Sequence, residues 1–303
     1  MKYSALIILL FAIAGCCNHE PKTAGSAHTD EFWTHRFVYN ADIQYGKSED
    51  QKLDVYSQGQ WVGEPNYWQA DTVMHPTFVY IHGGGWLGGS KDNVTFFIMP
   101  YMQKGYNVVN IEYGKGEGSA PLAVNDCMLA FKWIVRNAKE HNIDLNNIYV
   151  AGESAGGHLA MITGLLNSEP GKHPLYCGDS LKIKGIVNWF GITDIAAVEK
   201  YLQTTHPEWN YARQWVGDPA RMDSISKKYS PIHNITKNSP PIISIQGEND
   251  SVVPPSQAIA LHKILDQQKI KNELVMIKGG KHLGFSNDGF QEAYTRIFKF
   301  IGN

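Results

Sequence analysis

The 303-residue chain has few cysteines and no excess of charge of either sign. Four cysteines are too few for disulfides to hold together a chain of this size. The 27 basic and 29 acidic residues give a formal net charge of −2, and no basic block occurs, which argues against a nucleic-acid partner. Because 43% of the residues are hydrophobic, the composition excludes a disordered chain. A globular protein of one or two domains remains.

The sequence also has no apolar run long enough to cross a membrane. Its most apolar stretch, residues 5–14, follows Lys2 and is typical of a secretory signal peptide. The stretch ends in Ile-Ala-Gly-Cys at 13–16, which resembles the lipobox of bacterial lipoproteins; this resemblance implies cleavage before Cys16 and a lipid on its sulfur. We therefore predict a signal peptide over 1–15, a polar tether over 16–31, and an extracytoplasmic protein anchored to a bacterial membrane, in the periplasm or at the cell surface. An ordinary cleaved signal with chance cysteines is the alternative.

Strand-like and helix-like segments alternate along the rest of the chain. Two β-rich edge segments come first, at 37–46 and 52–58, and apolar runs typical of buried parallel strands follow at 77–81, 107–111, 147–151, 186–190, 242–246 and 274–277. Helical spacing of apolar residues marks 122–135, 158–166, 259–265 and about 288–300. This order predicts an α/β fold with a mostly parallel central sheet and helices on both faces.

One segment, about 195–241, breaks the alternation. It contains no strand pattern but has proline-containing turns and a group of aromatic residues: Tyr201, Trp209, Tyr211, Trp215 and Tyr229. So many aromatic side chains would not stay in water, so we expect a lid or a pocket wall instead of a disordered loop. With this insertion included, residues 32–303 are predicted to form one domain.

Two glycine-rich motifs point to different functions. Residues 83–88 fit G-x-G-x-x-G after a strand, and Glu112 ends the next strand, where a dinucleotide-binding fold places its ribose carboxylate. However, this motif lies about eighty residues into the chain, and Trp86 is bulky where a pyrophosphate must approach the backbone. The interpretation based on the second motif, residues 152–156, explains more of the other residues in the sequence.

Residues 152–156, Gly-Glu-Ser-Ala-Gly, fit G-x-S-x-G between a predicted strand and a predicted helix. Such a serine sits on a tight turn that projects its hydroxyl above the sheet. Side chains two positions away would clash, which explains Gly152 and Gly156. The turn also brings the Ala155 N–H to a helix start, where it faces developing negative charge. We therefore predict that Ser154 is a nucleophile.

A serine nucleophile needs a base and a carboxylate that orients the base. In α/β-hydrolases these follow the serine in the order acid, then histidine. Asp250 is a better acid than Glu248 because it lies further into the loop after the 242–246 strand. His282 is the predicted base, since it follows the last strand and a glycine turn.

The glycine loop at 82–86 gains a second interpretation beside this serine. Backbone amides of Gly84 and Gly85 would complete an oxyanion hole with Ala155, because glycine lets a substrate carbonyl approach the main chain. His82 is expected to brace the loop and not to take part in the chemistry.

Together, HGGGW, GESAGG, GENDSVVP and GGKHLGF resemble the HGGG-type esterase/lipase branch of the α/β-hydrolases. Over about 40–302 the likeness is to small acetyl- and feruloyl-esterase-like carbohydrate esterases. It implies an α/β-hydrolase fold, an acyl-enzyme mechanism that needs no cofactor or metal, and small-molecule or oligosaccharide esters as substrates. Because the cap helices of the hormone-sensitive-lipase group are not evident, the pocket is expected to come from 195–241.

Two further functions stay open at this point. Kynurenine formamidases share a similar layout of these motifs, so a formamide is an alternative substrate. A non-catalytic ligand-binding protein is a second alternative. Trp86, Glu153 and Trp189 are predicted substrate contacts, the two tryptophans by stacking on an aromatic acyl group or a sugar ring; core packing is their alternative role.

Overall fold

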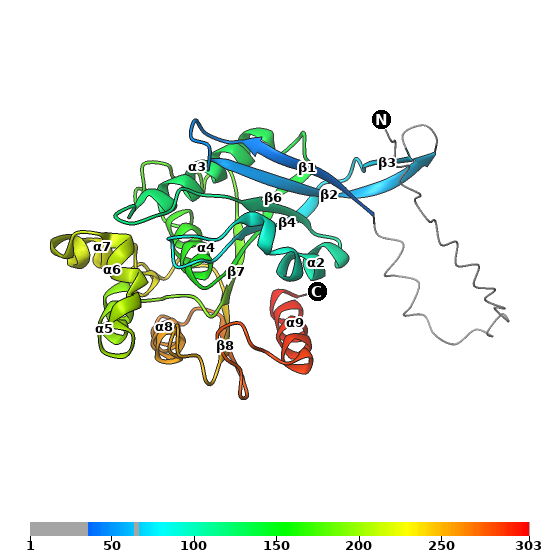
Figure 1. Ribbon diagram of the computed structural model, residues 1–303. Coiled ribbons are helices and arrows are strands. Elements are labelled where there is room, and N and C mark those ends of the chain that lie inside the picture. Colours follow the sequence, from blue (N-terminus) through cyan, green and yellow to red (C-terminus); the bar gives the residue numbers. More distant parts are fainter. Residues whose placement is uncertain (1–35, 64–66, 303) are drawn as a thin grey trace, which may run out of the picture. The chain divides into compact units, whose positions relative to one another are not determined.

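The computed structural model describes residues 36–63 and 67–302. A nine-stranded sheet runs through this part of the chain in the order β1-β2-β5-β4-β6-β7-β8-β9, with β3 paired to β2 (Figure 1). The strands are β1 (Arg36–Gln44), β2 (Lys52–Gly63), β3 (Tyr67–Ala70), β4 (His75–Ile81), β5 (Asn107–Ile111), β6 (Ile143–Glu153), β7 (Ile183–Trp189), β8 (Ile242–Gly247) and β9 (Asn272–Ile277). β1, β2 and β3 pair antiparallel and β2 joins β5 antiparallel, whereas every pairing from β5 to β9 is parallel.

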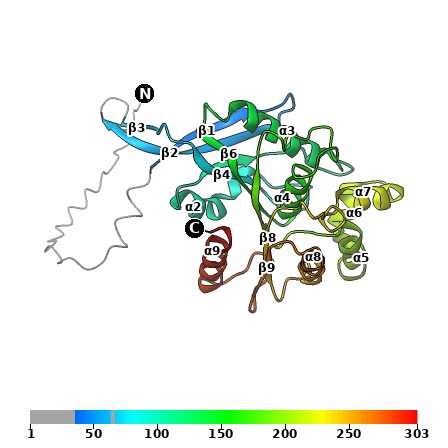
Figure 2. The same ribbon diagram turned by 180° about the vertical axis from the view of Figure 1, so that it is seen from behind.

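Helices cover both faces of this sheet, as Figures 1 and 2 show from opposite sides. α2 (Thr95–Gln103) and α9 (Asn287–Ile301) lie on one face, and α3 (Leu122–Asn137), α4 (Ala155–Leu166) and α8 (Ser256–Gln267) lie on the other. The predicted α/β fold class, with a mostly parallel central sheet and helices on both faces, is therefore confirmed.

The two faces of the sheet follow from the two-residue period of its strands. In β4, Phe78 and Tyr80 join the apolar cluster under α2 and α9, whereas Val79 and Ile81 join the cluster under α3 and α4. A strand that is apolar on both faces appears in the sequence as a continuous run, which is why 77–81 could be recognised.

Outside the insertion, one strand and one α-helix were not predicted. β3 is a four-residue strand that pairs only with β2, and α2 contains Pro100 and has Val94 as its N-cap residue, which makes no side-chain cap hydrogen bond. Neither element carries the usual signal: β3 is too short for a clear alternation, and α2 has no capping residue and an internal proline.

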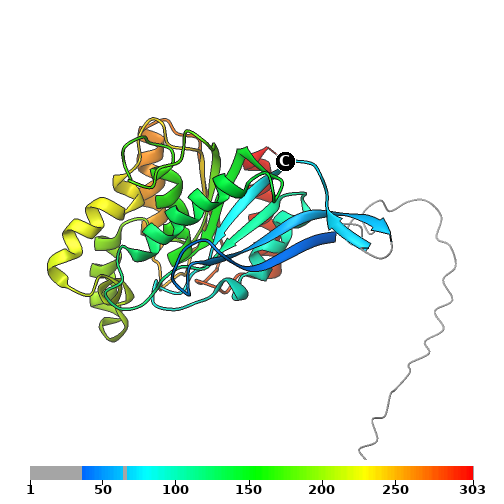
Figure 3. The same cartoon turned by 90° about the horizontal axis from the view of Figure 1, so that it is seen from above.

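The insertion at 195–241 has no strand, as predicted, and the structure adds that it folds as helices. It contains α5 (Ile195–Thr205), α6 (Tyr211–Val216) and α7 (Met222–Tyr229), with short 3₁₀ turns η2 (Pro207–Trp209), η3 (Pro219–Arg221) and η4 (Pro231–His233). Asp194 and Asn210 cap α5 and α6 by accepting from backbone amides. Figure 3 shows this segment, in yellow and yellow-green, on the far side of the sheet from the β2–β3 hairpin.

The predicted signal peptide, the tether and Cys16 lie outside the described residues. Across 36–63 and 67–302, no helix combines the length and hydropathy that crossing a bilayer requires.

The turn between β6 and α4 is the most constrained point of the fold. Ser154 has φ 56° and ψ −121°, a conformation that non-glycine residues rarely adopt. A Cβ on Gly152 would lie 2.5 Å from the Ile81 carbonyl oxygen, and a Cβ on Gly156 would lie 2.0 Å from it. Helix α4 thus begins in contact with the end of β4, and only glycine at these two positions permits the approach.

We expect Gly156→Ala to destabilise the fold by more than about 3 kcal/mol, because the clash is with backbone atoms that cannot repack. Gly88→Ala is the matched control, since nothing lies within 4 Å of its Cβ position. Urea unfolding of both variants tests this; equal stabilities for the two would contradict the assigned constraint.

Candidate active site

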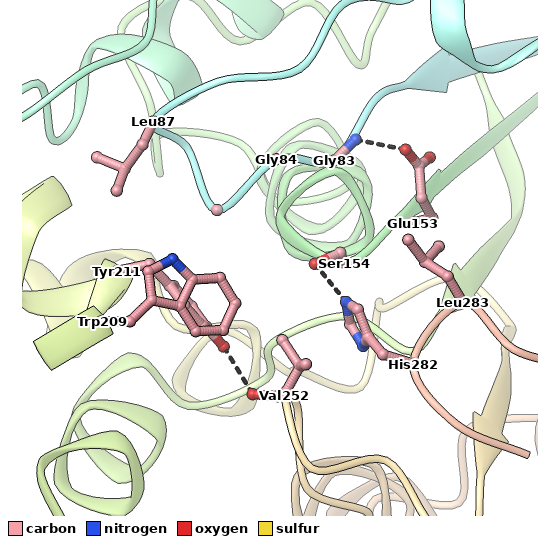
Figure 4. A pocket seen from close by; sticks show the side chains of 11 residues that line it. Gly83, Gly84, Leu87, Glu153, Ser154, Trp209, Tyr211, Val252, His282 and Leu283 are labelled. Atoms are coloured by element: carbon pink, nitrogen blue, oxygen red, sulfur yellow. Dashed lines mark hydrogen bonds between the residues drawn. The ribbon is translucent and has the colours of Figure 1, made fainter. Parts of the chain in front are cut away.

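Three side chains from distant parts of the chain form one hydrogen-bonded series. Ser154 Oγ lies 2.9 Å from His282 Nε2 (Figure 4), and His282 Nδ1 lies 2.8 Å from Asp250 Oδ2. Ser154 follows β6, Asp250 follows β8 and His282 follows β9, so all three lie at the carboxyl ends of parallel strands. The Asp250 carboxylate accepts a hydrogen bond from Nδ1–H, which leaves Nε2 free to accept the Ser154 hydroxyl proton.

Asp250 is held firmly for this task. It is 4% exposed; its Oδ1 accepts from the amides of Val252 and Val253, both at 2.9 Å, and its Oδ2 also accepts from Gln246 Nε2 at 3.1 Å. Glu248, the weaker candidate, is exposed and accepts from the Gly279 amide. The structure therefore places Asp250, and not Glu248, beside the histidine.

The three predicted oxyanion donors lie around the serine. Within the described residues, the amides of Gly84, Gly85 and Ala155 donate to no protein acceptor. Gly84 and Gly85 have φ of 116° and 62°, and a Cβ on Gly84 would lie 2.2 Å from the Gly88 carbonyl oxygen. Three unpaired amides beside a serine hydroxyl can accept an oxygen that gains negative charge.

The Gly83 amide, unlike those of Gly84 and Gly85, donates a hydrogen bond within the protein. It donates to Glu153 Oε1 at 2.6 Å, and Tyr80 Oη donates to Glu153 Oε2 at 2.8 Å. Burial raises the pKa of Glu153, against the opposing effect of these two hydrogen bonds. Glu153, a predicted substrate contact, lines the pocket, but both of its oxygens accept hydrogen bonds within the protein.

His82 braces the glycine loop from behind, as expected. Its Nδ1 lies 2.7 Å from the Gly83 carbonyl oxygen, its Nε2 lies 2.8 Å from Glu112 Oε1, and its ring stacks on Tyr113 at 4.3 Å. Both ring nitrogens thus lie within hydrogen-bond distance of an oxygen on the loop or on Glu112.

Both carboxylate oxygens of Glu112 already accept hydrogen bonds within the protein, so neither is available to bind a ribose. Burial alone would raise its pKa, but hydrogen bonds from His82 and Lys115, and the charge on His82, outweigh burial and lower the pKa to about 2. The Lys91 amide donates to its second oxygen. The role that a dinucleotide-binding fold would give Glu112 is therefore filled by a brace inside the protein.

A cavity of about 460 Å³ opens above Ser154. It is lined by residues of the glycine loop, the serine turn, the insertion and the two loops that carry Asp250 and His282: Gly83, Gly84, Gly85, Leu87, Glu153, Ser154, Trp209, Tyr211, Val252, His282 and Leu283. In Figure 4, Trp209 and Tyr211 lie to one side of Ser154, and Glu153 and Leu283 lie to the other. The insertion therefore forms one wall of the pocket, as the sequence predicts.

Three apolar lining residues were missed by sequence reasoning. Leu87, Val252 and Leu283 each lie within two residues of a predicted site residue, so their position beside the motifs was the available signal. Leu283 is 65% exposed, which is unusual for a leucine and marks the rim of the pocket.

The structure corrects the prediction for Trp86 and Trp189. Both indoles are fully buried and neither lines the pocket. Trp86 stacks on Trp215 at 4.3 Å and donates to His158, whereas Trp189 donates to Tyr101 on the α2 face of the sheet. A ring without exposed surface cannot stack on a ligand, so core packing is the role of both.

No group of His, Cys, Asp and Glu in the part of the chain that the structure describes is arranged to hold a metal ion.

Several known proteins to which the chain is similar are named esterases. The BD-FAE family model matches residues 67–265, a range that includes Ser154 and Asp250 and ends before His282. Esterase LipC of Mycobacterium tuberculosis is 26% identical over 229 residues, covering 74% of this chain and 54% of LipC, so the chain spans about half the length of this relative. Kynurenine formamidase of Danio rerio is 26% identical over 271 residues, covering 86% of this chain and 81% of the formamidase.

Among solved structures, a truncated carbohydrate esterase from gut microbiota superposes with a TM-score of 0.69. It covers 89% of this chain and 98% of that one at 22% identity, a likeness that concerns the fold.

We expect Glu112→Gln to lower the stability by about 3 kcal/mol at pH 7. Because folding lowers this pKa from 4.5 to about 2, the ionised carboxylate stabilises the fold above pH 4.5, and that stabilisation is lost as the pH falls toward 2. Urea unfolding should therefore show a difference in the free energy of unfolding between wild type and Glu112→Gln that becomes smaller from pH 5 to pH 3. The control Glu140→Gln, at an exposed carboxylate, should show no such difference. A stability difference that does not depend on pH would contradict the conclusion that the ionised Glu112 carboxylate stabilises the fold.

Proposed function

The chain belongs to the BD-FAE family, and on this premise we propose that it is a serine carboxylic ester hydrolase that works through an acyl-enzyme. The observation that carries the proposal is the series Ser154–His282–Asp250 at the base of a 460 Å³ pocket, next to three backbone amides without protein partners.

The geometry supports the following sequence of steps. Ser154 Oγ attacks the ester carbonyl carbon while His282 Nε2 takes its proton, and Asp250 stabilises the resulting imidazolium. The carbonyl oxygen becomes an oxyanion that accepts from the free amides of the glycine loop and Ala155. His282 then protonates the departing alcohol, and water repeats the same steps on the acyl-enzyme to release the acid and restore Ser154.

We propose short acyl or hydroxycinnamoyl esters of carbohydrates as substrates. The pocket offers apolar walls from Leu87, Trp209, Tyr211 and Val252, which suit an acyl group or an aromatic ring. The fold of the carbohydrate esterase from gut microbiota, which covers most of this chain, is consistent with this class.

A formamide substrate is the second candidate. Kynurenine formamidase matches most of both chains, and an amide carbonyl would use the same nucleophile and oxyanion donors. The two candidates differ in the leaving group, which is an alcohol in one case and an amine in the other.

We expect Ser154→Ala to lower kcat on p-nitrophenyl acetate by a factor on the order of 10⁶. Ser180→Ala, at an exposed serine away from the pocket, is the control and should hydrolyse the ester at the wild-type rate. Retention of more than a few per cent of activity in Ser154→Ala would exclude this serine as the nucleophile.

We expect Trp209→Ala to lower kcat/KM about 10-fold on feruloyl esters but less than about 3-fold on acetyl esters, because only an aromatic acyl group is large enough to contact the indole. Trp209 is 47% exposed, so its removal should leave the fold intact. A panel of acetyl, butyryl and feruloyl esters and an aryl formamide measures this. An equal loss on every substrate would show that the indole does not select the acyl group.

A further inference from the structure

The Asp250 carboxylate depends on two peptide units of its own loop. Its Oδ1 accepts from the N–H of Val252 and from the N–H of Val253, both at 2.9 Å. These two amides belong to the Ser251–Val252 and Val252–Val253 peptide units. The orientation of these two units therefore decides where the carboxylate lies and whether its Oδ2 can meet His282.

The opposite ends of the same two peptide units are held by the insertion. Tyr201 Oη, on α5, donates to the Ser251 carbonyl oxygen at 3.0 Å. Tyr211 Oη, on α6, donates to the Val252 carbonyl oxygen at 3.1 Å, the contact drawn in Figure 4. Each peptide unit thus binds a tyrosine hydroxyl at its C=O and the Asp250 carboxylate at its N–H.

Two consequences follow from elementary chemistry. A hydrogen bond at the carbonyl oxygen fixes the plane of a peptide unit and therefore the direction of its N–H. It also polarises the unit, which strengthens that N–H as a donor to the carboxylate. Burial of Tyr211 raises the pKa of its phenol, so the hydroxyl keeps the proton that it donates.

Tyr211 also touches other parts of the site. Its ring lines the pocket, and a Cβ on Gly85 would lie 3.3 Å from the Tyr211 Cβ. A single side chain thus contacts the substrate cavity, the glycine loop with its oxyanion donors, and the loop that holds Asp250.

We propose that Tyr201 and Tyr211 are positioning residues that act through Asp250. The 195–241 insertion then holds the Asp250 carboxylate in the orientation that His282 requires, in addition to forming a wall of the pocket. This inference rests on the proposed function for its kinetic test, but the hydrogen bonds on which it stands do not depend on the substrate.

The kinetic test uses Tyr201→Phe, Tyr211→Phe and the double variant, which keep both rings and remove only the hydroxyls. We expect kcat on p-nitrophenyl acetate to fall about 5-fold in each single variant, with KM within about 2-fold of wild type, because one hydrogen bond to the acid loop is lost. Tyr229→Phe is the matched control: Tyr229 is a buried tyrosine of the same insertion, and its hydroxyl has no protein partner in the described ranges. Its kcat should stay at the wild-type value.

Repeating the tyrosine substitutions in the Asp250→Ala variant distinguishes a positioning effect on Asp250 from a general packing effect. With Asp250→Ala the carboxylate is gone, so adding either tyrosine substitution should change the residual kcat by less than about 2-fold. The same 5-fold loss in that background would overturn the proposal, as would unchanged kcat in the wild-type background. Melting temperatures of all variants identify any that lose activity by unfolding.

A further measurement needs no substrate. The proton on His282 Nδ1, hydrogen-bonded to Asp250, can be followed by its downfield proton resonance, and we expect its exchange with water to be several-fold faster in the double variant than in wild type or Tyr229→Phe. Equal exchange rates would overturn the proposal. If wild type hydrolysed no ester, the proposed function would fail, while this measurement would still decide the role of the two tyrosines.

Discussion

The contact between the start of helix α4 and the end of strand β4 is the constraint on which the rest of the site depends. Gly152 and Gly156 lie so close to the Ile81 carbonyl oxygen that neither tolerates a Cβ. This approach forces Ser154 into a strained conformation with φ of 56°, which directs its hydroxyl out of the sheet. It also brings the Ala155 amide and the glycine loop after β4 to the same point, so one packing contact positions both the proposed nucleophile and the proposed oxyanion donors.

The glycine loop needs support because its amides must face the cavity without partners. That support comes from polar side chains buried behind it: His82 binds both the Gly83 carbonyl and Glu112, and Glu153 binds the Gly83 amide. Buried polar groups are costly unless they are hydrogen-bonded, and each of these side chains is hydrogen-bonded. The loop is held from the protein side, so its pocket side stays available to substrate.

The insertion has a similar double role. Its aromatic residues form a wall of the pocket, while two of its tyrosines hold the carbonyl groups of the loop that carries Asp250. Attachment of a pocket wall to the loop that carries Asp250 links the shape of the cavity to the geometry of the proposed Ser154–His282–Asp250 triad. A segment that breaks the alternation of strands and helices is thus bonded to the site at several points.

The sequence by itself determined the local features, because each depends on residues close together in the chain. Continuous apolar runs marked the central strands, and glycine on both sides of Ser154 marked its turn. The order of Asp250 and His282 after their strands marked their place at one edge of the sheet. Side-chain surroundings were decided only by the tertiary structure. Trp86 and Trp189 are next to site motifs yet point into the core, whereas Trp209 and Leu283 reach the pocket, because burial depends on which elements pack above each residue. The pairing of Tyr201 and Tyr211 with a loop some forty to fifty residues away also required the fold, since no local pattern encodes a hydrogen bond between distant backbone and side-chain groups.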